Sequence, residues 1–223
     1  MQQHPQAEES LQAINDIRGM MARSARFLSL SGWSGIWAGC TALVGAAIGY
    51  AFLPHSLLEA NYLSGPTRME DAAPYCFCGA DFYQPLILAT LIFIVALAGA
   101  YYFTWKKMRR EGTSLWHPAS KQLMVAVAVP MIVGGIFVLA FMRYGHPVYI
   151  APACLAFYGL ALVNGSKHTL TDIRYLGYLE ILLGVICLFV PGWGLYFWVL
   201  GFGILHILYG IIMWNKYDKR PAA

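Results

Sequence analysis

Charged side chains are scarce in this sequence. Asp, Glu, Lys and Arg make up 12% of the 223 residues, about half of their usual share in a soluble domain, whereas 59% of the residues are hydrophobic. So few polar groups do not suit a water-covered fold, which excludes a soluble enzyme, a disordered regulator, a coiled coil and a fibrous protein. The composition therefore predicts a multi-pass membrane protein.

Other features are missing as well. Five cysteines are too few and too scattered for a disulfide scaffold. The first 26 residues are polar and contain no cleavable signal peptide, so we expect the first apolar run to act as an uncleaved anchor. No apolar run alternates as the strands of a membrane barrel do, so the fold is predicted to be all-α. The sequence has no phosphate-binding glycine loop for a nucleotide, and only one histidine lies deep in a span, whereas haem between helices generally needs two axial ligands. We therefore expect no cofactor.

Six apolar runs approach the roughly 20 residues that a helix needs to cross a bilayer. We expect a cytoplasmic amphipathic helix over 1–27, a six-helix transmembrane domain over 28–217 and a cytoplasmic tail over 218–223. The spans are expected at about 28–53, 85–105, 122–142, 148–164, 175–190 and 195–214. Pro130 in the third span and Pro152, one turn inside the short fourth span, are expected to kink their helices.

The placement of basic residues predicts the orientation. All Lys and Arg residues except Arg68 and Arg143 fall on the side of the membrane that carries both termini. Because cytoplasmic loops are enriched in Lys and Arg, both termini are expected in the cytoplasm. The membrane is expected to be the inner membrane of a bacterium. This basic side favours anionic lipid over nucleic acid as its partner.

Apolar residues before the first span recur every three or four positions, at Leu11, Ile14, Ile17 and Met21. This spacing indicates an amphipathic helix lying on the membrane surface, and the alternative is a docking helix for a cytoplasmic partner.

Small residues recur at helical spacing in three spans and let helix backbones approach closely. They are Ser31, Gly35, Gly39, Gly45 and Gly49 in the first span, Gly177 and Gly184 in the fifth, and Gly203 and Gly210 in the sixth. We expect a tight bundle or an oligomer. The short turn Pro191–Gly194 predicts that the fifth and sixth spans form a tight hairpin, the last of three successive hairpins.

Two stretches carry a resemblance to a known family. The chain from Ser166 to Tyr217, with SKHTLTDIRYLGYLEILLG, FVPGWG and LGFGILHILYGIIM, resembles the C-terminal half of an uncharacterised family of bacterial multi-pass inner-membrane proteins. The segment RFLSLSGWSGIWAG near the N-terminus is similar to the corresponding part of that family. The resemblance implies the six-span topology and implies no activity.

Two ionisable residues, Glu180 and His206, lie inside predicted spans. Because the turn between their helices is centred between Gly192 and Trp193, they should lie within about 1.5 Å of the same depth. A buried charge is costly, so such a pair is either a proton-responsive or proton-relaying site or a structural hydrogen bond.

Two further motifs are weaker indicators of a chemical site. The Gly32-Trp33-Ser34-Gly35 segment matches the pattern around the nucleophile of intramembrane serine proteases, but it lies on the first span instead of a later one. Cys76 and Cys78, in the exterior loop, could form an intermolecular disulfide, stay free, or bind a thiophilic metal with His55 or Asp81. We expect no catalytic residue and no metal site.

These observations favour a non-catalytic membrane module that self-associates or joins a protein partner in the membrane or the cytoplasm. The alternative is a small-solute or proton-coupled transporter, or a stress- or pH-responsive membrane protein, that uses Glu180 and His206.

Overall fold

The computed structural model describes residues 31–52, 80–112, 118–144 and 146–219. These residues form helices joined by turns and contain no strand. The amphipathic helix expected within 1–27, and the exterior cysteines Cys76 and Cys78, lie outside the described residues.

The helices follow the predicted spans closely. They are α2 (Gly32–Phe52), α4 (Ala80–Glu111), α5 (Pro118–Arg143), η2 (Pro147–Tyr149), α6 (Ile150–Gly165) and α7 (Ile173–Leu188). The chain then runs through α8 (Gly194–Trp198), η3 (Val199–Leu205), α9 (His206–Met213) and η4 (Trp214–Asp218), which we together call the C-terminal helix.

Five of the described helices are long and apolar enough to cross a membrane. The remaining helix, α7, has 16 residues and is about 24 Å long, less than a hydrocarbon core of about 30 Å. The prediction of an all-helical membrane protein is therefore confirmed, whereas six complete spans remain a prediction.

The helix ends differ from the predicted ones where polar residues continue a helix beyond its apolar run. Helix α4 covers Ala80–Glu111 instead of the predicted 85–105. It extends beyond the apolar run at both ends, and its last turn contains Arg109 and Arg110. Pro152 lies in the first turn of α6, where a backbone N–H has no partner within the helix, so this proline requires no kink. Helix α5 continues through Pro130.

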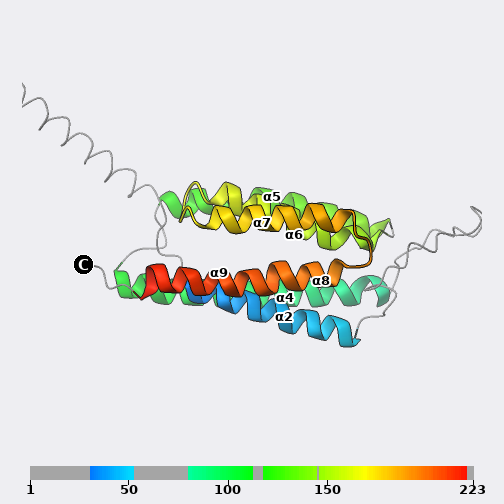
Figure 1. The fold of residues 1–223 in the computed structure, drawn as a ribbon, viewed down its shortest axis with the longest axis horizontal. Helices are drawn as coiled ribbons and strands as arrows, with labels where there is room; N and C mark the ends of the chain where they lie inside the picture. The colour runs from blue at the N-terminus through cyan, green and yellow to red at the C-terminus, as the bar shows by residue number, and fades with distance from the viewer. Residues whose placement is uncertain (1–30, 53–79, 113–117, 145, 220–223) are drawn as a thin grey trace, which may run out of the picture.

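The helices are arranged in two layers of three (Figure 1). One layer contains α5, α6 and α7, and the other contains α2, α4 and the C-terminal helix. The fifth and sixth spans are joined by the expected short turn and touch at Glu180 and His206, but they do not pack as the tight hairpin that the sequence predicted. After the Pro191–Gly194 turn the chain passes into the other layer, where the C-terminal helix packs mainly on α2.

Glycines explain why the C-terminal helix packs on α2. A Cβ at Gly35 would lie 3.0 Å from Gly210 Cα, and one at Gly39 would lie 2.7 Å from Gly203 O, so these backbones are in direct contact. Without a Cβ at the crossing, the two helices gain extensive van der Waals contact, which drives helix association in lipid.

The other predicted small residues also face helices of this chain. Gly177 contacts Gly159 O, and Gly184 contacts the backbone of Ala156, both between α7 and α6. Gly45 faces Ile92 of α4, and Gly49 is buried. Since these surfaces are occupied within one chain, their spacing no longer argues for an oligomer.

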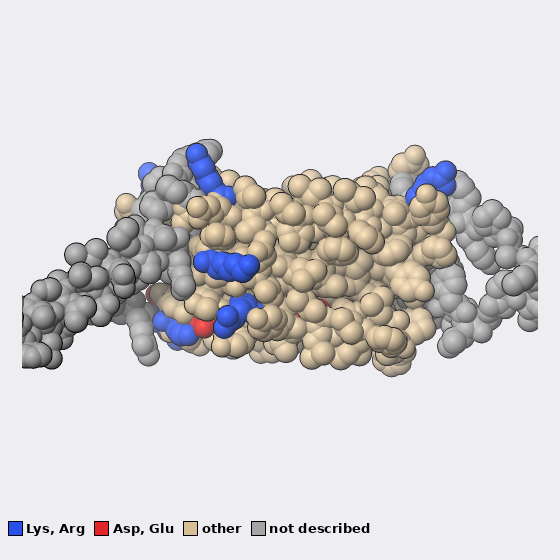
Figure 2. All heavy atoms as spheres, turned by 90° about the horizontal axis from the view of Figure 1, so that it is seen from above, with Lys and Arg blue, Asp and Glu red and all other residues tan. Residues whose placement is uncertain are grey.

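One end of the molecule carries every described Lys and Arg except Arg143, and we call it the basic end. Figure 2 shows these side chains gathered there, next to a broad band of almost entirely uncharged side chains. That band is where lipid would surround the helices, because exposed apolar side chains are stable in hydrocarbon.

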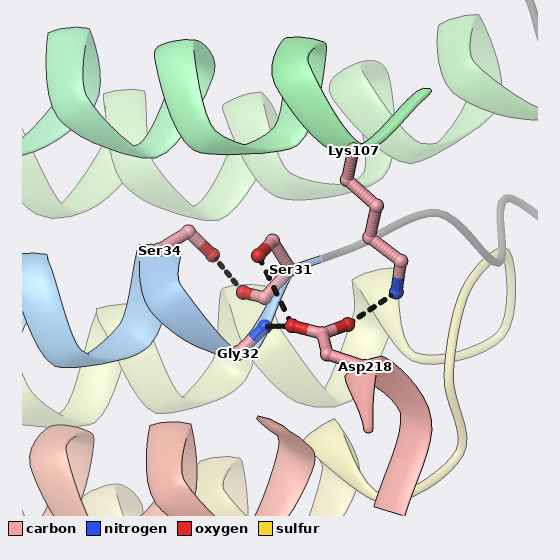
Figure 3. Close-up of polar contacts among 5 residues, drawn as sticks. All are labelled: Ser31, Gly32, Ser34, Lys107 and Asp218. Carbon is pink, nitrogen blue, oxygen red and sulfur yellow. Dashed lines mark hydrogen bonds and ion pairs between the residues drawn. The ribbon is translucent and has the colours of Figure 1, made fainter. Parts of the chain in front are cut away.

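Asp218, at the end of the C-terminal helix, connects the three helices of its layer at the basic end (Figure 3). Its carboxylate accepts hydrogen bonds from Ser31 Oγ at 3.2 Å and from the backbone N–H of Gly32 at 2.9 Å, at the start of α2. It also forms an ion pair with Lys107 Nζ of α4 at 2.7 Å. The carboxylate thus satisfies a backbone donor that the first turn of α2 leaves unpaired.

Lys216 and Tyr217, which directly precede Asp218, connect the C-terminal helix to the other layer. Asp172, just before α7, accepts hydrogen bonds from Lys216 Nζ and from Tyr217 Oη. The hydrogen bond from Lys216 is the main reason why the pKa of the Asp172 carboxyl lies below its ordinary value.

The glycine contact predicts a large effect of one methyl group. A Cβ at Gly210 would lie 2.6 Å from Ile36 N and 2.8 Å from Gly32 O, both of which are backbone atoms that cannot rotate away. Gly210→Ala should therefore lower the free energy of unfolding in detergent by about 1–3 kcal/mol. Gly135→Ala, on α5 with nothing within 4 Å, is the control and should not be destabilised. Equal losses in the two variants would contradict this packing.

The ion pair of Asp172 predicts a pH dependence. A carboxyl whose pKa is lowered by folding stabilises the protein above its unfolded-state pKa of about 4, and this contribution disappears as the pH falls through the folded-state value. The melting temperature of Asp172→Asn should therefore be below that of the wild type at pH 7 and approach it below about pH 4. Lys216→Met should lose the same contribution, and the double variant should lose no more than either single variant.

Candidate functional site

Three polar side chains from three helices meet between the two layers. Tyr158 comes from α6 and Glu180 from α7, and His206 is the first residue of α9 in the opposite layer. Glu180 is fully buried and His206 is 5% exposed. We call these three residues the interlayer site.

Both ring nitrogens of His206 have partners. Nδ1 lies 3.0 Å from the carbonyl oxygen of Gly201, which can only accept, so Nδ1 carries a hydrogen and donates it. Nε2 lies 2.8 Å from Tyr158 Oη. The tyrosine hydroxyl donates to Nε2 when the ring is neutral, and it accepts from Nε2–H when the ring is charged.

Glu180 is the least satisfied member of the site. Its Oε1 lies 3.4 Å from His206 Nδ1, a distance typical of an ion pair but too long for a strong hydrogen bond. Within the described part of the chain, neither carboxylate oxygen has a hydrogen-bond partner. A carboxylate in such a place is costly unless a positive charge compensates it.

Gly201 provides the space for this carboxylate. A Cβ at that position would lie 2.6 Å from Glu180 Oε2. Gly201 belongs to η3, a π-helical segment that ends directly before His206. Such segments are rare, occur frequently at functional sites, and change the direction of the side chains that follow them.

Aromatic rings continue from the site toward the end of the molecule opposite the basic end. The Phe202 ring lies 5.9 Å from the His206 ring and 5.2 Å from the Tyr158 ring, and the Trp198 ring lies 4.5 Å from Phe202. These contacts join the C-terminal helix to α6, so the interlayer site is enclosed by apolar rings on that side.

The site can hold different numbers of protons with little movement of its heavy atoms. The Tyr158 hydroxyl can reverse its hydrogen bond to Nε2, so His206 can gain or lose a proton there. The adjacent Glu180 carboxylate offsets the charge when His206 is protonated. His206 Nε2 is thus the place in this site where a proton can be gained or lost.

The sequence predicted Glu180 and His206 at a common depth, and the structure also turns them toward each other. Tyr158 was not predicted. The sequence feature that could have identified Tyr158 is its hydroxyl near the middle of the fourth span, because lipid offers a hydroxyl no hydrogen-bond partner there. The change of layer after Gly194 was also missed, and this change places His206 on the boundary between the layers instead of along a hairpin.

The structure does not bring together the serine and histidine that a protease would need. Ser34 Oγ donates to the carbonyl of Ser31, and the ring of His206 contacts Gly201 and Tyr158 instead. Among the described residues, no three His, Cys, Asp or Glu side chains gather as metal ligands.

Comparisons with protein-family models, with curated proteins and with solved structures find no match for this chain. The resemblance to a bacterial membrane-protein family therefore remains a prediction.

The hydrogen bond from Tyr158 predicts a measurable contribution to stability. Tyr158→Phe removes the partner of His206 Nε2 in a buried place, so the free energy of unfolding in detergent should fall by about 1–3 kcal/mol. Tyr178→Phe, an exposed tyrosine on α7, is the matched control and should leave stability nearly unchanged. Equal values for the two variants would show that the Tyr158 hydroxyl contributes nothing.

Proposed function

We propose that this chain is a non-catalytic, proton-responsive membrane protein in which the protonation of the interlayer site controls how the two three-helix layers pack. One observation carries the proposal. The buried Glu180 carboxylate, without a hydrogen-bond partner among the described residues, lies 3.4 Å from His206 of the other layer. Histidine is the side chain whose ordinary charge change falls between pH 5 and pH 8.

The location of the site supports a response of the whole fold. Within each layer, helix backbones touch at glycines, as at Gly35 with Gly210 and at Gly159 with Gly177. Between the layers, contact near the site depends on side chains such as Tyr158 and Phe202. A charge change at this boundary would therefore alter the contact between layers more than the packing inside them.

The proposal includes the identity of the membrane and the orientation of the chain in it. The basic end favours the cytoplasmic side, which would place both chain ends in the cytoplasm of a bacterium below its inner membrane. Association with itself or with another protein remains part of the proposal, although the glycine surfaces are used inside the chain.

A carrier that moves a small solute together with a proton is the second candidate. It is favoured by a cavity that lies between the same two layers. However, Glu180, His206 and Tyr158 do not line this cavity. The described arrangement therefore supports a proton-responsive packing change better than a transport path.

The proposal predicts a distance change that depends on pH. Spin labels at Leu97 of α4 and Ile132 of α5, both exposed and in different layers, would report on the layers in nanodiscs after the five native cysteines are replaced by alanine. The distance distribution should shift between pH 5 and pH 8, and Glu180→Gln should remove this shift.

Asp218→Asn is the matched control, because it removes a carboxylate at the basic end whose printed partners all lie within one layer, and it should keep the response. His206→Gln should abolish the shift as Glu180→Gln does. A wild-type distance that does not change with pH, or a shift that persists in Glu180→Gln, would contradict the proposal and leave the site a structural hydrogen bond.

A further inference from the structure

A cavity of about 200 Å³ lies between the two layers, near the end of the molecule opposite the basic end. Both layers contribute to its walls. Its lining includes Gly49 of α2, Ile92 of α4, Met142 of α5, Ala151 of α6 and Trp198 of α8.

The cavity follows from the path of the C-terminal helix. Over α9 and η3 this helix packs on α2, where Gly35 and Gly39 meet its backbone. Over α8 it lies against α6 instead, and a Cβ at Gly194 would lie 3.1 Å from Ala151 Cβ. The small residues of α2 continue past this divergence as Ala46 and Gly49, which line the open space.

The walls select an uncharged apolar occupant. Among the described residues that line the cavity, none has a charged group or a hydroxyl, and Trp198 alone has a side-chain N–H. A stable buried water needs two to four polar partners, so these walls disfavour water. An enclosed apolar protein cavity of about 150 Å³ is known to stay dry and to bind benzene, whereas the cavity described here is partly open to its surroundings.

We propose that this cavity binds an uncharged apolar group about the size of a benzene ring or slightly larger. The group would belong either to a free apolar molecule dissolved in the membrane or to the acyl chain of a lipid. The inference goes beyond the proposed function and does not rest on it, because the interlayer site lines none of the cavity.

The binding test uses benzene as the probe and the melting temperature in detergent as the readout. Benzene should raise the melting temperature of the wild type by a few degrees, because a ligand that binds only the folded state stabilises it. Ala46→Leu should remove this shift by filling the cavity. Ala47→Leu, which adds the same side chain at the neighbouring exposed position of α2, should keep it.

The outcome that overturns the proposal is equally specific. If benzene does not stabilise the wild type, or stabilises Ala46→Leu as much as Ala47→Leu, and the nanodisc comparison below also shows equal quenching, the cavity binds no apolar group. Should Ala46→Leu fail to fold, Ala46→Val adds less volume and should give a reduced shift under the same measurement.

Nanodiscs of lipid with brominated acyl chains distinguish the two sources of the ligand. If an acyl chain occupies the cavity, Trp198 fluorescence should be quenched more in the wild type than in Ala46→Leu, with Trp198→Phe used to isolate its signal. Equal quenching together with stabilisation by benzene would assign the cavity to a free apolar molecule. Equal quenching without that stabilisation would overturn the proposal.

Discussion

The close approach of α2 and the C-terminal helix determines how the rest of the structure is arranged. Gly35 and Gly39 on α2 meet Gly203 and Gly210, so the backbones touch over several turns. In lipid, where apolar side chains gain little by avoiding their solvent, such close contact is a main source of helix association. It places the last helix beside the first and in the other layer from α7, its neighbour in sequence.

The polar contacts follow from this arrangement. Because the C-terminal helix lies in the other layer from α7, Glu180 and His206 face each other across the layer boundary instead of along a hairpin. At the basic end, Asp218 binds its own layer and Tyr217 reaches Asp172 of the other. A single helix thus carries polar contacts with the other layer at two places, one at the basic end and one at the interlayer site.

Much of this fold was predictable from the sequence, because lipid imposes a length and an apolar composition on each helix. The glycine spacing predicted close packing and the position of the turn predicted the depth of Glu180 and His206. The partners of the glycines were not predictable, since Gly35 and Gly210 are far apart in the chain and periodicity identifies a face without its neighbour. For the same reason Tyr158 was missed, because its importance comes from the helix that it faces.

The boundary between the layers combines two properties that an apolar bundle otherwise lacks. It contains polar groups whose charge depends on protons, and it contains unfilled space. Trp198 lines that space and its ring packs on Phe202, which in turn lies beside the His206 ring. The cavity and the interlayer site thus share the C-terminal helix, and any coupling between binding at one and protonation at the other must act equally in both directions.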